Sequence, residues 1–279
     1  MTGRRWSCAL GTLAWAAMAA ALGVGVVVAA EPEATGERFA FPFLLHERGL
    51  TPHKDMFLLP YSHSSRYKGE NSEVIFQLGG KHDVFGTRLY VAYTQISFWQ
   101  AYNTGASSPF RDSNYNPEMF YRFGERRLGP WAYAGDVGIE HQSNGQTVPL
   151  SRSWNLLYAA PYLRGDRWLA YVKLRYRIPE SQKETPLSAE GDDNPDITDF
   201  LGYSDIHLYY ASPHAILFHL QVRGYIGADR GNVSLNASIP FTGEKDAYFV
   251  LRLFSGYGES MVDYRRPIDR VGIGVMFQR

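Results

Sequence analysis

The sequence predicts an all-β protein, a twelve-stranded antiparallel transmembrane β-barrel. Three observations favour this fold. Apolar residues alternate with polar ones at a period of two, aromatic residues recur near the ends of these segments, and no apolar stretch after residue 31 is long enough for a membrane helix. Aromatic residues make up 15% of the chain, with 19 Tyr and 16 Phe. A soluble sandwich also alternates, but the aromatic strand ends favour the barrel.

Residues 1–30 have the layout of a secretory signal peptide. Two arginines precede an apolar run of small residues, which ends in Val-Ala-Ala directly before Glu31. An uncleaved membrane anchor is the alternative, because the run is long for a signal core. Cleavage would leave a periplasmic N-terminal segment over 31–55 and the barrel, with its catalytic hairpin, over 56–279.

Charge and cysteine content exclude several classes of function. The chain has 28 basic and 28 acidic residues, and loss of the first 30 residues removes only two arginines. This balance argues against a nucleic-acid partner. The single cysteine, Cys8, lies in the segment expected to be removed, which excludes disulfides and thiolate metal sites from the mature chain.

Alternation along the chain defines the individual strands. In residues 215–223, for example, Phe218 and Leu220 share one face while His219 and Gln221 share the other. The last strand should pair with the first, because hydrocarbon cannot satisfy an open strand edge. The expected strands cover 56–64, 72–80, 86–99, 114–123, 130–143, 152–163, 166–178, 200–211, 214–225, 230–239, 245–255 and 268–278. The charged, proline-containing stretch 180–199 is expected to be an extracellular loop.

One hairpin carries polar residues on the face that should contact lipid. On the strand over 130–143, His141 and Ser143 share the parity of apolar and aromatic residues, so they should project outward. Asn155, on the next strand, is assigned to the outward face as well. A symmetric register opposes His141 to Asn155, with Cβ atoms ~5 Å apart. Serine, histidine and asparagine then stand in the order of a nucleophile, a base and a group that orients the base.

The alternative is that these residues only form a polar rim near an extracellular turn. Histidine, serine and asparagine are ordinary there, and spacing alone does not separate the two readings. If the group is catalytic, its outward position points to a substrate that the bilayer presents, such as an acyl ester.

The residues around this hairpin resemble those of the outer-membrane phospholipase A family of Gram-negative bacteria. The stretch "EHQSNGQTVPLSRSWNLLY" carries the resemblance, and further blocks agree in order: "HKDMFLLPYS", "YTQISFWQ", "SSPFRDSNYNPE", "DDNPDITDFLGY" and "SGYGESMVDY" followed by "RVGIGVM". The resemblance covers roughly residues 50–279. It implies a multi-pass protein of the bacterial outer membrane with its active site toward the outer leaflet.

The resemblance also implies an activity. This is calcium-dependent hydrolysis of the acyl esters of phospholipids and lysophospholipids, with phospholipase A1 and A2 specificity, by a homodimer. The Ser-His-Asn triad of the family falls on Ser143, His141 and Asn155, and the backbone N–H of its oxyanion hole falls on Gly145.

The calcium (Ca²⁺) ligands implied by the resemblance are Ser151, the backbone carbonyl of Gln146, and Ser107 of the partner subunit. The family commonly has arginine at position 146, which a backbone ligand tolerates. From the residues alone, the acidic run "EGDDNPD" is the metal candidate, although such a run is more often a solvated loop.

Gln95 shares the outward parity of its strand, and the resemblance implies a role at the dimer interface. A position near the lipid headgroups, where water satisfies the amide, is the alternative. Two other functions stay open: a non-enzymatic barrel that acts as a pore or adhesin, and an esterase that removes acyl chains from lipopolysaccharide.

Overall fold

The computed structural model describes residues 41, 44, 49–224, 230–241 and 247–278. The expected signal peptide and most of the expected segment over 31–55 lie outside the described residues. No helix within the described ranges is long and apolar enough to cross a membrane.

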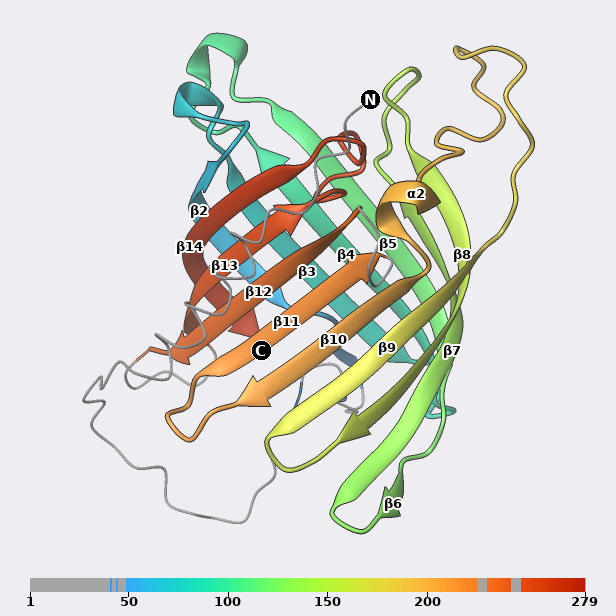
Figure 1. Ribbon diagram of the computed structural model, residues 1–279, viewed down its shortest axis with the longest axis vertical. Coiled ribbons are helices and arrows are strands. Elements are labelled where there is room, and N and C mark those ends of the chain that lie inside the picture. The colour runs from blue at the N-terminus through green and yellow to red at the C-terminus, as the bar shows by residue number, and fades with distance from the viewer. Residues whose placement is uncertain (1–40, 42–43, 45–48, 225–229, 242–246, 279) are drawn as a thin grey trace.

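A closed antiparallel β-barrel forms the molecule, as the sequence predicts (Figure 1). Each wall strand pairs with the next along the chain, and the last wall strand pairs with the first, which closes the sheet. The twelve wall strands are β2 (Met56–Ser64), β3 (Val74–Asp83), β4 (Leu89–Trp99), β5 (Phe110–Arg122), β7 (Trp131–Ser143), β8 (Ser153–Arg164), β9 (Trp168–Arg177), β10 (Ser204–Ala211), β11 (Leu217–Gly224), β12 (Gly231–Pro240), β13 (Tyr248–Gly256) and β14 (Ile268–Gln278).

Several short elements extend the ends of the barrel. They are the strands β1 (Leu50–Pro52) and β6 (Arg126–Leu128), the 3-10 turns η2 (Gly69–Asn71) and η3 (Thr104–Ala106), and the helix α2 (Thr198–Leu201). Two boundaries differ from the prediction by four residues, and the others differ by three or fewer. β5 begins at Phe110, which pairs with Trp99 on β4, and the strand expected over 200–211 begins only at Ser204, because α2 precedes it.

The two faces of the wall are as different as the alternation predicts. On β7, Val137 and Ile139 point outward and are 43% and 45% exposed, while Asp136 and Glu140 point inward and are each 3% exposed. On β14, glycine is needed where the strand meets β2, since a Cβ on Gly274 would lie 2.0 Å from the carbonyl oxygen of Leu58. The outer face therefore suits lipid, and the inner face suits a polar lumen.

The described end of the segment expected in the periplasm belongs to the barrel. β1 pairs with β3 next to β2, and the three residues between β1 and β2 enter the lumen. There His53 contacts Glu118 at 3.2 Å, Lys54 donates to Asn116 at 2.6 Å, and Asp55 lies 2.7 Å from His219. Pro52 and this polar triplet interrupt the alternation, which hides β1 in the sequence.

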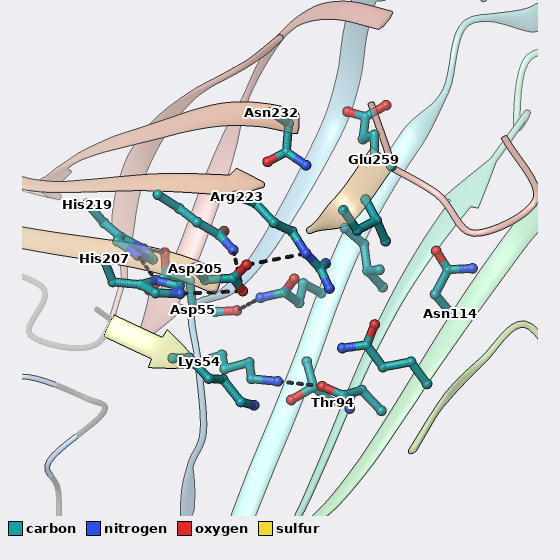
Figure 2. A pocket seen from close by; sticks show the side chains of 18 of the residues that line it. Lys54, Asp55, Thr94, Asn114, Asp205, His207, His219, Arg223, Asn232 and Glu259 are labelled. Atoms are coloured by element: carbon teal, nitrogen blue, oxygen red, sulfur yellow. Dashed lines mark hydrogen bonds and ion pairs between the residues drawn. The ribbon is translucent and has the colours of Figure 1, made fainter. Parts of the chain in front are cut away.

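Ion pairs and hydrogen bonds fill much of the lumen. Lys173 on β9 donates to Glu118 at 2.9 Å and to Glu140 at 2.6 Å, and Arg175 donates to Glu140 at 2.8 Å. A cavity of about 210 Å³ lies in the lumen. Figure 2 shows Asp55, His207 and His219 together on one side of it and Arg223 beside Asp205. Such a network is strong only when complete, and the bonds of Lys173 and Arg175 join β9 to β5 and β7.

The mouth of the barrel next to α2 is covered by an apolar cluster. It brings together α2, β8 and the β13–β14 connection, and consists of Trp154, Leu156, Ile197, Leu201, Met261 and Tyr264. These buried side chains close the mouth from above. In the described part of the chain, the lumen therefore has an apolar cover at this end and ion pairs in its interior.

Candidate active site

The three candidate catalytic residues lie together on the outer face of the β7–β8 hairpin. The register is the expected one: His141 pairs with Asn155, and Ser143 pairs with Ser153. His141 Nδ1 lies 2.8 Å from Asn155 Oδ1. Because an amide oxygen can only accept, the Nδ1 atom of the ring is the donor, and Nε2 is left as the acceptor.

Ser143 is two residues beyond His141 on the same strand, so both side chains leave the same face of the sheet. In the described part of the chain no hydrogen bond of the Ser143 hydroxyl is recorded. The contact between His141 and Asn155, the expected base and its orienting group, is thus already formed, while a hydrogen bond between Ser143 and His141 is not. Such contacts commonly tighten only when substrate is bound.

The backbone at His141 is held in an unusual way. Pro117 on β5 falls opposite His141 when the β5–β7 register is continued, and proline cannot donate to the ladder. The side chain of Asn116 replaces the missing donor and bonds to the carbonyl oxygen of His141 at 3.0 Å. Lys54 in turn donates to Asn116 at 2.6 Å, so a luminal residue anchors the strand at the site.

Asn155 is held from its other side by the loop after β9. Its Nδ2 donates to Oε1 of Glu180 at 3.1 Å. The backbone N–H of Ile178 bonds to the carbonyl oxygen of Asn155 at 2.8 Å, which carries the β8–β9 pairing past the end of β9. The amide of Asn155 therefore lies between an imidazole and a carboxylate.

The connection after Ser143 is a compact turn built on Asn144. Its Oδ1 accepts from the N–H of Arg152, and its Nδ2 donates to the carbonyl oxygen of Leu150, both at 2.9 Å. Gly145 has a φ of +62°, which favours glycine, and a Cβ there would approach the Tyr115 ring to 3.0 Å. The expected oxyanion donor thus lies on a fixed turn beside the aromatic residue that pairs with Ser143 across β5 and β7.

Two of the expected calcium ligands belong to this connection. The hydroxyl of Ser151 donates to Oδ2 of Asp193 at 2.5 Å. The side chain of Gln146 is directed to Arg111 and Asp112 on β5, so its backbone carbonyl is the group left for a ligand role. Ser107 lies apart from these residues, on the exposed turn between β4 and β5, with a left-handed φ of +61°.

Gln95 lies on the outer face of β4, in the same cross-strand row as the site. It pairs with Tyr115, which pairs with Ser143, so two strand spacings, ~10 Å, separate Gln95 from Ser143. Its amide is already satisfied within the chain. Oε1 accepts from Tyr93, and Nε2 donates to Ser97, both at 3.0 Å.

The loop between β9 and β10 is fastened to the hairpin and to the barrel mouth. Asn194 accepts from the N–H of Ser153 at 2.9 Å. Asp196 accepts from Tyr264 at 2.5 Å and from Arg265 at 2.8 Å. Partial burial alone would raise the pKa of Asp196, but these two hydrogen bonds outweigh it and hold the pKa below its ordinary value.

Comparison with known proteins identifies the family. A family model described as Phospholipase A1 matches residues 45–277. The chain belongs to the phospholipase A1 family. The phospholipase A1 of Proteus vulgaris is 38% identical over 192 residues, which cover 67% of this chain. The match covers only 61% of that protein, so the chain spans about 61% of the length of this curated relative.

Solved structures of the phospholipase A1 family have the same fold. The calcium-bound dimer of the outer membrane phospholipase of Salmonella typhi is 30% identical, with a TM-score of 0.73, over 85% of this chain and 96% of that chain. An active-site mutant of Escherichia coli outer membrane phospholipase A, in which alanine replaces an asparagine, is also 30% identical with a TM-score of 0.73, over 88% and 98% of the two chains. The chain is an outer-membrane barrel of this family.

Two residues of the site, Asn116 and Glu180, were missed by the sequence reasoning. Asp193 was named only as part of the acidic run "EGDDNPD". A period of two continued past Arg177 would have placed Glu180 on the outer face, one step beyond the partner of Asn155. Nothing in the sequence separates Asp193 from the other acidic residues of its run, because its role follows from how the loop folds onto the hairpin.

Proposed function

We propose that this protein is a calcium-dependent phospholipase of the outer membrane, which hydrolyses acyl esters of phospholipids and lysophospholipids at both the A1 and A2 positions. The observation that carries the proposal is the 2.8 Å contact between His141 Nδ1 and Asn155 Oδ1, on the outer wall next to Ser143. A polar rim without function would not need an imidazole held in one tautomer beside a free hydroxyl.

The mechanism follows from the atoms available. Ser143 Oγ attacks the ester carbonyl carbon while Nε2 of His141 takes the hydroxyl proton. Asn155 keeps the ring in place by accepting from Nδ1. As the tetrahedral intermediate collapses, the bond to the leaving alcohol breaks, and His141 gives the proton to that alcohol. Water then attacks the acyl-serine in the same way and releases the fatty acid.

The negative charge on the carbonyl oxygen needs stabilisation. The backbone N–H of Gly145 is the donor that we assign to it. Calcium, when bound, would polarise the same carbonyl and offset the charge. The residues fit such a cation, because Ser151 brings a hydroxyl oxygen against the carboxylate of Asp193, and a hard cation prefers oxygen ligands. Ser151, the Gln146 carbonyl and Ser107 of the partner subunit are the proposed ligands.

The active species in this proposal is a homodimer. Gln95 and Ser143 lie in one row across β4, β5 and β7, and the turn that carries Ser107 connects β4 to β5. Contact between two barrels through the β4–β5 face would therefore bring the partner's Ser107 loop toward the site. The same row supports a role for Gln95 at the interface, although its amide does not need a partner to be satisfied.

A passive pore is disfavoured by the ion pairs in the lumen and by the apolar cluster that closes its mouth. Lipopolysaccharide remains a rival substrate, because its acyl esters are also presented by the outer leaflet. The chemical identity of the released chain separates the two, since lipopolysaccharide yields hydroxylated fatty acids.

The test is hydrolysis of a defined diacyl phospholipid by the purified protein in detergent. Fatty acid release should require calcium, stop with a chelator, and be lost in Ser143→Ala. Ser153→Ala is the matched control, because it removes a hydroxyl directly across the strand pair. The folded state of each variant is checked by its mobility on a gel without heating. A Ser143→Ala protein with normal turnover would exclude Ser143 as the nucleophile.

A further inference from the structure

Glu180 makes a side-chain contact to Asn155 that neither the triad nor the calcium ligands explain. It lies in the loop after β9, half-buried, and accepts from Nδ2 of Asn155 at 3.1 Å. Within the described residues no ion pair to Glu180 is recorded. Charge pairing therefore does not explain why this carboxylate lies against the amide of Asn155, and we look to the chemistry of the site for its role.

The position of Glu180 is fixed on both sides. Before it, the N–H of Ile178 bonds to the carbonyl oxygen of Asn155 at 2.8 Å, and Pro179 has a restricted φ. After it, the N–H of Asp192 bonds to the carbonyl oxygen of Ser181 at 2.8 Å. The carboxylate is therefore held by the backbone and does not depend on a free loop to reach Asn155.

The chemistry of the contact decides which way the amide points. The oxygen and nitrogen of an asparagine amide have nearly the same shape, so shape alone does not prevent a flip. A carboxylate only accepts hydrogen bonds, so the NH₂ group of Asn155 must face Glu180, and Oδ1 must face His141. The ring of His141 then donates from Nδ1 and keeps Nε2 free to take a proton.

The flipped amide would reverse this result. With Nδ2 directed at His141, the ring nitrogen Nδ1 would have to accept, and the proton of the neutral ring would sit on Nε2. That tautomer cannot take the proton of Ser143. We infer that Glu180 is a positioning residue: its carboxylate fixes the amide of Asn155 and through it the proton-accepting tautomer of His141. This inference rests on the proposed function.

A second effect follows from charge. A carboxylate behind the amide favours the positively charged imidazole that forms during catalysis, and so supplies part of what an aspartate supplies in other triads. Glu180 would act through Asn155, with no contact to the substrate.

The experiment compares Glu180→Ala and Glu180→Gln with Glu184→Gln in the full-length protein in detergent. Glu184 is exposed in the same loop, so its variant removes the same charge without touching the site. The measured quantities are kcat, KM, the pH profile of kcat/KM and the calcium concentration for half-maximal activity. The other ionisable groups on the surrounding elements are the same in every variant: Tyr115, Glu140, Lys173, Arg175, Tyr176, Lys183, Asp192 and Asp193.

Glu180→Ala should lower kcat roughly 10-fold, as loss of a group behind a functional side chain does in metal sites, with KM unchanged within about twofold. The acid limb of its kcat/KM profile should move to lower pH, because a negative charge near the base is lost. Glu180→Gln keeps an acceptor oxygen, so it should retain more kcat than Glu180→Ala while showing the same displacement of the acid limb.

Two results would overturn the inference. One is a Glu180→Ala protein that matches Glu184→Gln in both kcat and pH profile. The other is a loss of activity with an unchanged acid limb and a higher calcium requirement, which would make Glu180 a part of the metal loop. If Glu180→Ala does not fold, an unmoved acid limb in Glu180→Gln decides against it. Absence of Ser143-dependent hydrolysis in the wild type would instead reject the proposed function itself.

Discussion

His141 and Asn155 face each other across the β7–β8 pair, with Nδ1 and Oδ1 2.8 Å apart, on the side of the wall that contacts lipid. The amide is a suitable partner at this depth, because a neutral group is easier to take out of water than a carboxylate. Glu180, half-buried in the loop after β9, accepts from the other side of this amide. In the proposed mechanism, Asn155 and Glu180 therefore share the role that an aspartate has in other triads.

Replacing Asn155 by aspartate should test this division. The variant brings a second carboxylate to within about 3 Å of Glu180, and two such groups cannot both ionise freely. Hydrolysis by Asn155→Asp at neutral pH should fall on the order of 10-fold. Adding Glu180→Gln to this variant should restore part of the lost hydrolysis rate, because a glutamine can donate a hydrogen bond to the new carboxylate. If the loss in the double variant is simply the product of the losses in Asn155→Asp and Glu180→Gln, the two side chains are not coupled.

Mixing two inactive variants should test the shared site. Consider a dimer of one Ser143→Ala protomer and one Ser107→Ala protomer. The site on the Ser107→Ala protomer has its own Ser143 and receives Ser107 from the other protomer, so it is complete. The site on the Ser143→Ala protomer lacks both serines. Random exchange of protomers in detergent should then recover about a quarter of the wild-type activity, as two-fold symmetry requires. Mixed samples that stay inactive would contradict the proposal that each site uses Ser107 of the partner subunit. The control is each variant refolded alone.

The luminal ion network should contribute strongly to stability. Glu140→Ala leaves Lys173 and Arg175 each without one of their partners inside the barrel. The free energy of unfolding, from denaturant titration in detergent, should fall by about 3 kcal/mol, since breaking a buried pair leaves charge uncompensated. Glu125→Ala, which breaks the more exposed pair with Arg164, should cost less than about 1 kcal/mol. Equal losses in the two variants would argue against a stabilising network.

Asp196 should make stability depend on pH in the acid range. Its pKa in the folded protein lies below the ordinary value, so its contribution is complete above about pH 3.9, the ordinary pKa of an aspartate, and is lost as the pH falls through the folded-state pKa. Asp196→Asn should lower the free energy of unfolding at neutral pH by under about 1 kcal/mol, because its partner Arg265 is half exposed. The difference from wild type should vanish at low pH.

Much of this arrangement could be predicted from the sequence, because a barrel wall has a strict period of two. That period gives the outward faces of His141, Ser143 and Asn155, and a symmetric hairpin gives the pairing of His141 with Asn155. The strand number follows from counting alternating segments, and the closing pair of β14 with β2 follows from the need to satisfy strand edges in lipid.

Contacts made by loops were beyond prediction. Glu180 and Asp193 reach the site only because the segment after β9 folds back over the hairpin and is tied there by Arg177 and Asn194. No periodicity exists in such a segment, and its path is set by single side-chain bonds. The luminal positions of His53 and Asp55 were missed for the same reason, since they lie in a short irregular link between β1 and β2.

The filled lumen has a consequence for the cell that carries this barrel. Since salt bridges lie in the interior and α2 helps to cover its mouth, the described residues should hinder the passage of nutrients and antibiotics through the barrel. A bacterium should then be able to raise the abundance of such a barrel with less loss of its envelope's permeability barrier than an open porin would cause.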